Sequence, residues 1–134
     1  MAGSRKIDPR RGISPEGSAI RVDASGFSLV TSQEPIFRVE WSSVSQIVGY
    51  TRFRSMKPEL CLAFAGSRPN DQVVVHDTLQ GWDALCSAML QVFAQADRDW
   101  HLKAAHDAEN LDSYLPVAAV VPNFTVNPTI VWSR

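Results

Sequence analysis

The chain has 134 residues, of which 45% are hydrophobic and 20% are charged, and its formal net charge is -1 at pH 7. This balance predicts one folded domain with its own core and excludes a collagen-like or highly charged disordered chain. No apolar run approaches the roughly 18 residues that span a bilayer, and residues 1–17 lack the apolar centre of a secretory signal. We therefore expect a cytoplasmic protein with no membrane span.

The first segment of the chain is basic, whereas the remainder is acidic. Residues 1–11 contain four basic side chains against the single acidic residue Asp8: Arg5, Lys6, Arg10 and Arg11. So few apolar residues lie in this segment that burial cannot offset the entropy of ordering it. We predict a disordered basic arm over residues 1–17 and a single domain over 18–134. Because no aromatic residues are interleaved with the basic ones, we expect no nucleic-acid partner.

Short segments with alternating apolar and polar residues follow one another from residue 19. The turn at residues 24–26 predicts a hairpin between strands at 19–23 and 27–31. Residues 36–41 alternate strictly, which predicts a strand that buries Phe37, Val39 and Trp41. Three further strands are expected over 44–54, 60–64 and 73–76, the first of them bent or bulged around Gly49.

One amphipathic helix follows these strands. Its apolar residues recur at the helical period: Leu79, Trp82, Leu85, Cys86, Met89, Leu90 and Phe93. Asp77 or Thr78 is the expected N-cap. Gly81 either allows the first turn to approach the sheet closely or marks a start nearer Trp82. The strand-then-helix order predicts an α+β fold, a meandering antiparallel sheet or partly open barrel of about six to seven strands capped by the helix.

Residues 97–134 are expected to form a C-terminal extension of the core at 18–96. Acidic side chains at its start are a candidate surface for a basic partner, although a solvated face is the alternative: Asp97, Asp99, Asp107, Glu109 and Asp112. The segment from Phe124 to Trp132 either completes the core or acts as an interaction segment, which would make a homo-oligomer. A second candidate is a basic loop for an acidic peptide, a phosphate or a lipid headgroup: Arg52, Arg54 and Lys57.

Motifs of known catalytic chemistry are missing from the sequence. His101 and His106 are five residues apart, which misses the spacing that places two imidazoles on one helix face for zinc. No glycine-rich phosphate loop and no nucleophile motif occur. Cys61 and Cys86 lie in apolar patterns, and we expect both to be buried and reduced. The sequence therefore predicts no catalytic residues, no metal and no cofactor.

Several apolar patterns together resemble those of a known class of small, uncharacterised bacterial proteins with a pleckstrin-homology-like (PH-like) organisation. The patterns are Phe37-x-Val39-x-Trp41, Val44-x-x-Ile47, the strand at 60–64 and Gly81-Trp82 at the start of the helix. The resemblance covers residues 18–95. It implies a meandering sheet capped by a helix, and a binding module for a peptide, a protein or a phosphoinositide.

The first hairpin loop decides which of these ligands we expect. Lipid-binding PH-like domains place several basic residues around that loop, whereas this chain has Ala24-Ser25-Gly26 with only Arg21 nearby. We therefore expect a non-catalytic module that docks a protein partner. One alternative is an immunity or antitoxin-like protein that neutralises a bacterial effector. Another is a small enzyme or ligand-binding barrel with a pocket under the helix, near Trp41, Tyr50 and Trp82.

Overall fold

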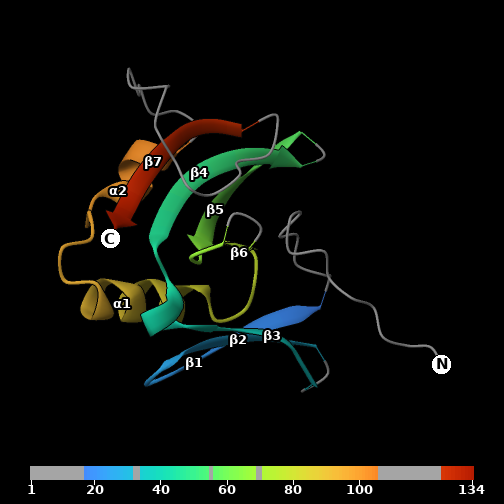
Figure 1. The fold of residues 1–134 in the computed structure, drawn as a ribbon. Coiled ribbons are helices and arrows are strands. Elements are labelled where there is room, and N and C mark those ends of the chain that lie inside the picture. Colours follow the sequence, from blue (N-terminus) through green and yellow to red (C-terminus); the bar gives the residue numbers. More distant parts are fainter. Residues whose placement is uncertain (1–16, 32–33, 55, 69–70, 106–124) are drawn as a thin grey trace.

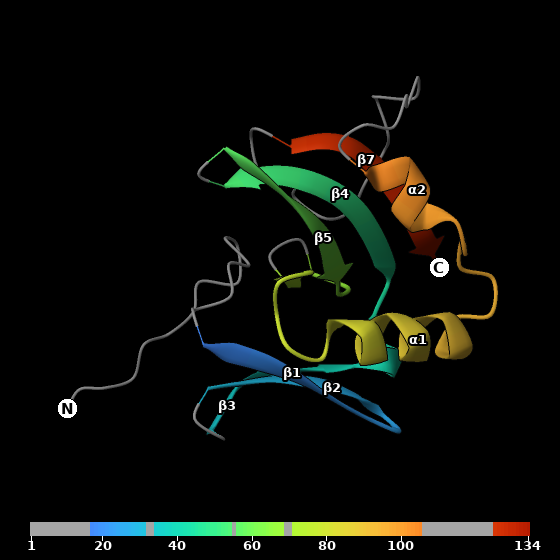
Figure 2. The ribbon, with the colours of Figure 1, turned by 180° about the vertical axis from the view of Figure 1, so that it is seen from behind.

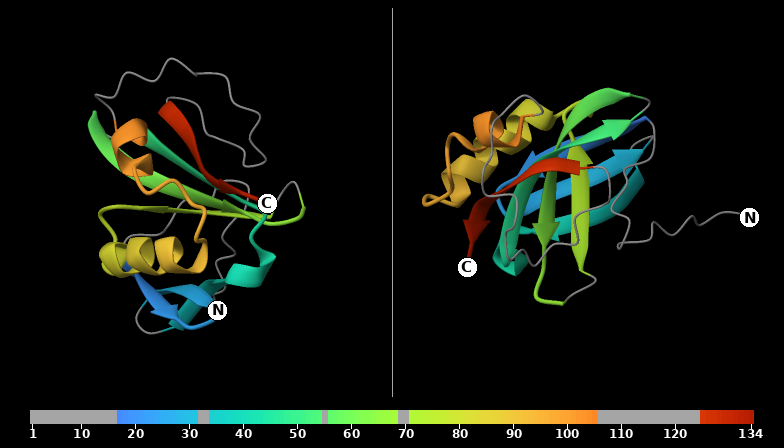
Figure 3. Two further views of the ribbon diagram at one scale, coloured as in Figure 1. Left: turned by 90° about the vertical axis from the view of Figure 1, so that its left-hand side faces the viewer. Right: turned by 90° about the horizontal axis from the view of Figure 1, so that it is seen from above.

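The computed structural model describes residues 17–31, 34–54, 56–68, 71–105 and 125–134. Within them, seven strands form two antiparallel sheets, one with the order β1-β2-β3 and one with the order β6-β5-β4-β7. The two sheets face each other, with the helix α1 beside them at one end (Figure 1). Seen from above, the strands of one sheet cross those of the other steeply (Figure 3). The predicted α+β class is confirmed.

The first sheet contains β1 (Ser18–Asp23), β2 (Gly26–Thr31) and β3 (Glu34–Glu40). The predicted hairpin between β1 and β2 is confirmed, with Asp23 opposite Gly26. The Asp23 carboxylate accepts hydrogen bonds from the backbone N–H groups of Ser25 (3.0 Å) and Gly26 (3.1 Å). A short acidic side chain that bonds the backbone two residues on favours a tight turn, so the loop sequence itself directs the chain back into β2.

The chain leaves the first sheet through a short 3-10 helix, η1 (Trp41–Ser43). Trp41 was expected at the end of a strand; it is buried as predicted, but it lies in this turn instead. Its ring packs between the sheets against Phe27 (5.6 Å between centroids) and Phe93 (5.9 Å). Burying this large ring turns the backbone away from β3, so β3 and β4 do not pair. The expected continuous meander is therefore wrong at this point, and the described strands close no barrel.

The second sheet contains β4 (Gln46–Arg54), β5 (Lys57–Ala65), β6 (Gln72–His76) and β7 (Thr125–Ser133). The last extended stretch of the chain thus pairs with β4 and forms an edge of the sheet, where Pro128 is tolerated. The irregularity expected around Gly49 occurs on the β7 side, where the register shifts twice. The pairing of β4 with β5 runs without a shift.

Two helices lie on the same side of the molecule, α1 (Trp82–Val92) and α2 (Trp100–Ala104) (Figure 2). The predicted caps Asp77 and Thr78 are wrong, because the N-cap of α1 is Gly81, with φ +92° and no side-chain cap. The N–H of Ile20 in β1 donates to the carbonyl of Gln80 at 2.8 Å. A Cβ on Gly81 would meet the Ile20 carbonyl oxygen at 2.2 Å, so glycine permits the expected close approach to the sheet.

The main hydrophobic core lies between the two sheets and α1. Leu85 and Met89 from α1 are fully buried there, on the face that the helical period predicted. They pack with strand residues that are also fully buried: Phe27, Leu29, Ile47 and Leu62. Each such side chain contributes about 1.5–3 kcal/mol relative to its exposed state. The apolar faces of both sheets and of the helix therefore fix their mutual arrangement.

Candidate functional site

A small groove opens where the edge strand β3 lies near the ends of β5 and β6. Its volume is about 170 Å³. Apolar and charged side chains both line it. The lining residues are Arg38, Val39, Glu40, Ser43, Val44, Phe64, Ala65, Gly66, Asp71 and Val73. All of them are brought together by the loss of pairing between β3 and β4, which leaves this side of the two sheets open.

The backbone of β3 presents hydrogen-bonding groups beside the groove that pair with no described strand. The Trp41 N–H donates to the Ser25 carbonyl at 2.9 Å, and Glu40 stands opposite Gly26 and Arg38 opposite Ser28. In an antiparallel pair the bonded residues alternate, so the N–H and C=O groups of Arg38 and Glu40 point away from β2. No described strand lies on that side of β3.

Arg38 organises the charges on the outer face of β3. Its guanidinium contacts Asp23 twice, at 2.7 and 2.8 Å, and its Nε donates to Glu40 at 2.8 Å. The hydrogen bonds from Arg38, followed by that from the Ser25 backbone, hold the pKa of the Asp23 carboxyl well below its usual range. Arg38 therefore already has two carboxylate partners. The three side chains together carry one net negative charge.

Asp71 also lines the groove and adds a further negative charge. Its carboxylate lies over Gly66, where a Cβ atom would meet it. None of the ion pairs between described residues includes Asp71, and its side chain is exposed. The groove is thus lined by apolar side chains together with two acidic residues and one basic residue. Such a surface suits an apolar side chain that is accompanied by a cation.

A buried polar cluster occupies the outer face of the second sheet. Arg52 Nε donates to Glu59 at 3.0 Å, and both side chains are almost fully buried. His76 Nδ1 lies 3.5 Å from Glu59 and 2.6 Å from the Thr78 hydroxyl. Burial lowers the pKa of His76, against the opposing effect of the Glu59 charge. With Arg52 balancing Glu59, a neutral His76 fits this cluster, and we assign the cluster a structural role.

Both cysteines are free, as predicted. Burial raises the pKa of Cys61 to about 12, and it also raises that of Cys86 to about 12. Cys61 is fully buried as expected, whereas Cys86 on α1 is only half-buried. Thiols with such pKa values hold their protons at neutral pH and are poor nucleophiles.

The three aromatic residues expected around a ligand pocket lie in different environments within the described structure. Trp41 belongs to the core between the sheets. Tyr50 belongs to a second cluster, which lies on the opposite face of β4 from the core residue Ile47. The Tyr50 hydroxyl is buried without a hydrogen-bond partner among the described residues. Trp82 packs instead against Trp100, with 6.2 Å between ring centroids.

The predicted acidic surface lies only partly within the described residues. Asp97 forms an ion pair with Lys103 at 2.5 Å, and Asp99 is exposed at the start of α2. The remaining members, Asp107, Glu109 and Asp112, lie outside the described residues. Asp97 also accepts a hydrogen bond from the backbone N–H of Asp99 at 2.9 Å, so its carboxylate stabilises the local turn.

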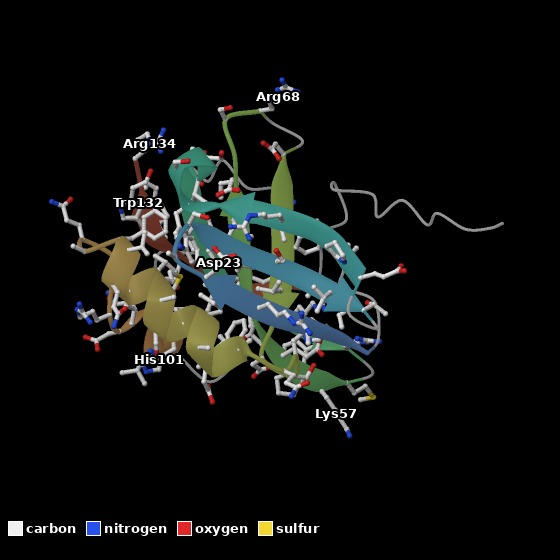
Figure 4. The ribbon with its side chains drawn as sticks, turned by 90° about the horizontal axis from the view of Figure 1, so that it is seen from below. Asp23, Lys57, Arg68, His101, Trp132 and Arg134 are labelled. Atoms are coloured by element: carbon white, nitrogen blue, oxygen red, sulfur yellow. The ribbon has the colours of Figure 1, made fainter. Side chains whose placement is uncertain are left out.

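The three residues of the predicted basic loop differ in burial. Arg52 faces Glu59, whereas Arg54 and Lys57 are exposed at the hairpin between β4 and β5. Lys57 and Arg68 lie at opposite ends of the molecule (Figure 4). Arg52 is thus committed to an internal ion pair, and only the other two members of the loop face solvent.

The predicted C-terminal interaction segment is also divided. Phe124 lies outside the described residues. Trp132 packs on Phe93 in the main core, with 4.5 Å between centroids, and Val131 beside it is buried. The described part of this segment therefore completes the core and the second sheet of its own chain, which was one of the two alternatives.

Sequence reasoning did not single out Glu40 and Asp71 as site residues. Glu40 is the polar last residue of an alternating strand and Asp71 directly precedes β6, and acidic residues at such positions are usually solvated. The alternation at 36–41 predicted the strand, but only the pairing of the sheets shows that β3 is an edge.

No protein-family model, curated protein or solved structure matches this chain. Among the described residues, no helix has the length and apolar character needed to cross a membrane. No group of three or more histidine, cysteine, aspartate or glutamate side chains in that same part of the chain could hold a metal ion.

Proposed function

We propose that this protein is a non-catalytic, PH-like binding module that docks an extended segment of a partner protein along the free edge of β3. The observation that carries the proposal is the alignment of the outward N–H and C=O groups of Arg38 and Glu40 with the adjacent groove. An extended peptide that adds to a sheet edge gains main-chain hydrogen bonds, while pockets beside the edge select its side chains. β3 offers both the outward backbone groups and the adjacent groove that this recognition mode requires.

The size of the groove favours a peptide side chain over a metabolite. Sites for small molecules usually enclose roughly 300–1,000 Å³. The groove holds about 170 Å³, which suits one apolar side chain. A ligand that relied on this groove alone would bury little surface, whereas a strand that also used the backbone of β3 would bury more.

The side chains of β3 oppose indiscriminate pairing of its edge with other strands. Unprotected edges pair indiscriminately, and charged residues and proline on an edge strand suppress that pairing. β3 carries Pro35, Arg38 and Glu40, and all three are exposed. A partner strand must therefore complement these side chains, which supports a specific docking site.

The first test removes one donor from the edge. Glu40 has φ -87° and ψ 134°, close to the range of proline, and its N–H points away from β2. Glu40→Pro therefore deletes an outward N–H with little cost to the fold, and Glu40→Gln is the matched control that changes only the charge. Peptides of roughly ten residues are selected from a random displayed library on the wild-type protein. We expect them to bind Glu40→Gln much more tightly than Glu40→Pro.

A second measurement separates strand addition from other binding modes. Only alternate residues of an added strand direct their N–H groups to the edge. N-methylation along a selected peptide should abolish binding at every second position and spare the positions between. Uniform tolerance, equal binding to both Glu40 variants, or a Glu40→Pro-sensitive dimer of the protein in place of peptide binding would each overturn the proposal.

A further inference from the structure

We infer that the docked segment carries an apolar residue and, directly next to it in sequence, a basic residue that faces the Glu40 carboxylate across the strand pair. This inference rests on the proposed strand addition at β3. It names the chemistry of the partner, which the edge alone does not specify.

The alternating directions of the side chains along β3 predict the apolar residue of the docked segment. Val39 points toward the space between the sheets and is half-buried at the groove. Val44, Phe64 and Val73 line the groove together with Val39. On an added strand, the residue opposite Val39 would point to the same side of the sheet and enter this groove. A charged residue there would lose its hydration against these apolar side chains.

The next position along the docked strand predicts the basic residue. The residue beside the apolar one points to the outer face, where its cross-strand neighbour is Glu40. Arg38 uses its guanidinium on Asp23 and Glu40, so the group holds a surplus of one carboxylate. A lysine or arginine at this position would offset that surplus.

An acidic residue at the same position would instead face the like charge of Glu40. Opposite charges directly across a strand pair are favourable, and like charges are unfavourable by a similar amount. Exposed ion pairs are individually weak, so the attraction of a basic residue and the repulsion of an acidic residue each change affinity only a few-fold. Together they give a preference of about tenfold for a basic over an acidic residue.

The test begins with the peptides that the wild-type protein selects. We expect an apolar–basic pair to be enriched among them. A synthetic peptide is then made with lysine, glutamine or glutamate at the basic position, and Kd is measured by fluorescence anisotropy. The lysine peptide should bind about tenfold more tightly than the glutamate peptide, and the difference should shrink at high salt.

Matched variants locate the charge effect. Glu40→Gln should weaken the binding of the lysine peptide a few-fold. Glu34→Gln, at the other end of β3, removes the same charge from an exposed position and should leave Kd unchanged. Equal affinities for the three peptides, or an equal effect of Glu34→Gln, would overturn this inference.

Failure of this inference can be told apart from failure of the proposed function. If selected peptides respond to Glu40→Pro and to alternate N-methylation but show no preference for a basic residue, strand addition stands and the charge assignment is wrong. If no peptide responds to Glu40→Pro, strand addition itself is wrong, and the charge assignment is wrong with it.

Discussion

Trp100 lies directly against the backbone of β4 at Gly49. A Cβ atom on Gly49 would be 2.4 Å from Cε3 of the Trp100 ring, too close for any real contact. Trp100 is 2% exposed, and the Thr51 hydroxyl donates to the Ala104 carbonyl at 2.7 Å. Glycine in β4 therefore provides the space in which α2 docks on the sheet.

The first prediction follows from this contact. Gly49→Ala should lower the free energy of unfolding by about 1–3 kcal/mol, because a buried ring or the strand must shift. Urea denaturation measures the loss. In a Gly49→Ala/Trp100→Leu double variant, the smaller side chain should relieve part of the clash, so the two effects should not add. Full additivity would show that the two residues are not coupled.

The start of α1 gives a second prediction. Gly81→Ala should destabilise the protein by about 1–3 kcal/mol, because φ is +92° there and the Ile20 carbonyl blocks a Cβ.

Asp77 does not cap the helix, and burial raises its pKa, so its ionised form is disfavoured in the folded state. Asp77→Asn should leave stability unchanged or raise it. A loss of about 1 kcal/mol in thermal or urea unfolding would instead indicate a cap.

The buried ion pair gives a third prediction. Glu59→Gln should reduce stability by about 3 kcal/mol, since it leaves Arg52 without a charged partner in a buried site. Asp23→Asn disrupts an ion pair with Arg38 that is open to solvent, and it should change stability little. Parallel urea titrations compare the two variants. Similar losses would contradict the distinction between buried and exposed pairs.

His76 gives a fourth prediction, on the pH dependence of stability. Burial lowers its pKa below the ordinary value of 6.5. As pH falls through 6.5 the unfolded chain therefore binds more protons at this residue than the folded chain, and the free energy of unfolding decreases. At higher pH both states hold a neutral imidazole, and the effect vanishes.

The charged and titratable groups around His76 are Glu59, Arg52, Arg54, Asp77 and Cys61, and Glu59 opposes the effect of burial. Unfolding is therefore measured for wild type and for His76→Gln between about pH 7.5 and 5.5. The wild type should lose stability relative to the variant as pH falls. A relative gain would mean that pairing of a charged imidazole with Glu59 outweighs burial.

Local patterns were sufficient to place most of the strands and the helix. The turn at 24–26 and the period of Leu85 and Met89 each depend on residues close in sequence, and the predicted hairpin and helix are confirmed. The burial of Cys61 followed for the same reason, since an apolar strand offers few other places for it. The alternation at 36–41 indicated β3, but Phe37 and Val39 are only half-buried and Trp41 lies in η1.

Contacts between residues distant in sequence decided the rest. Trp41 turned into the core and split the expected sheet, β7 paired with β4, and Gly81 replaced Asp77 and Thr78 at the helix start because Ile20 approaches there. The groove depends on the first of these, because residues of β3, of the segment around η1 and of the β5–β6 region line it. Short-range periodicity in the sequence was enough to specify the elements and most of their apolar faces, whereas long-range packing decided that no described strand pairs with the outer edge of β3 and that Glu40 and Asp71 line the same groove.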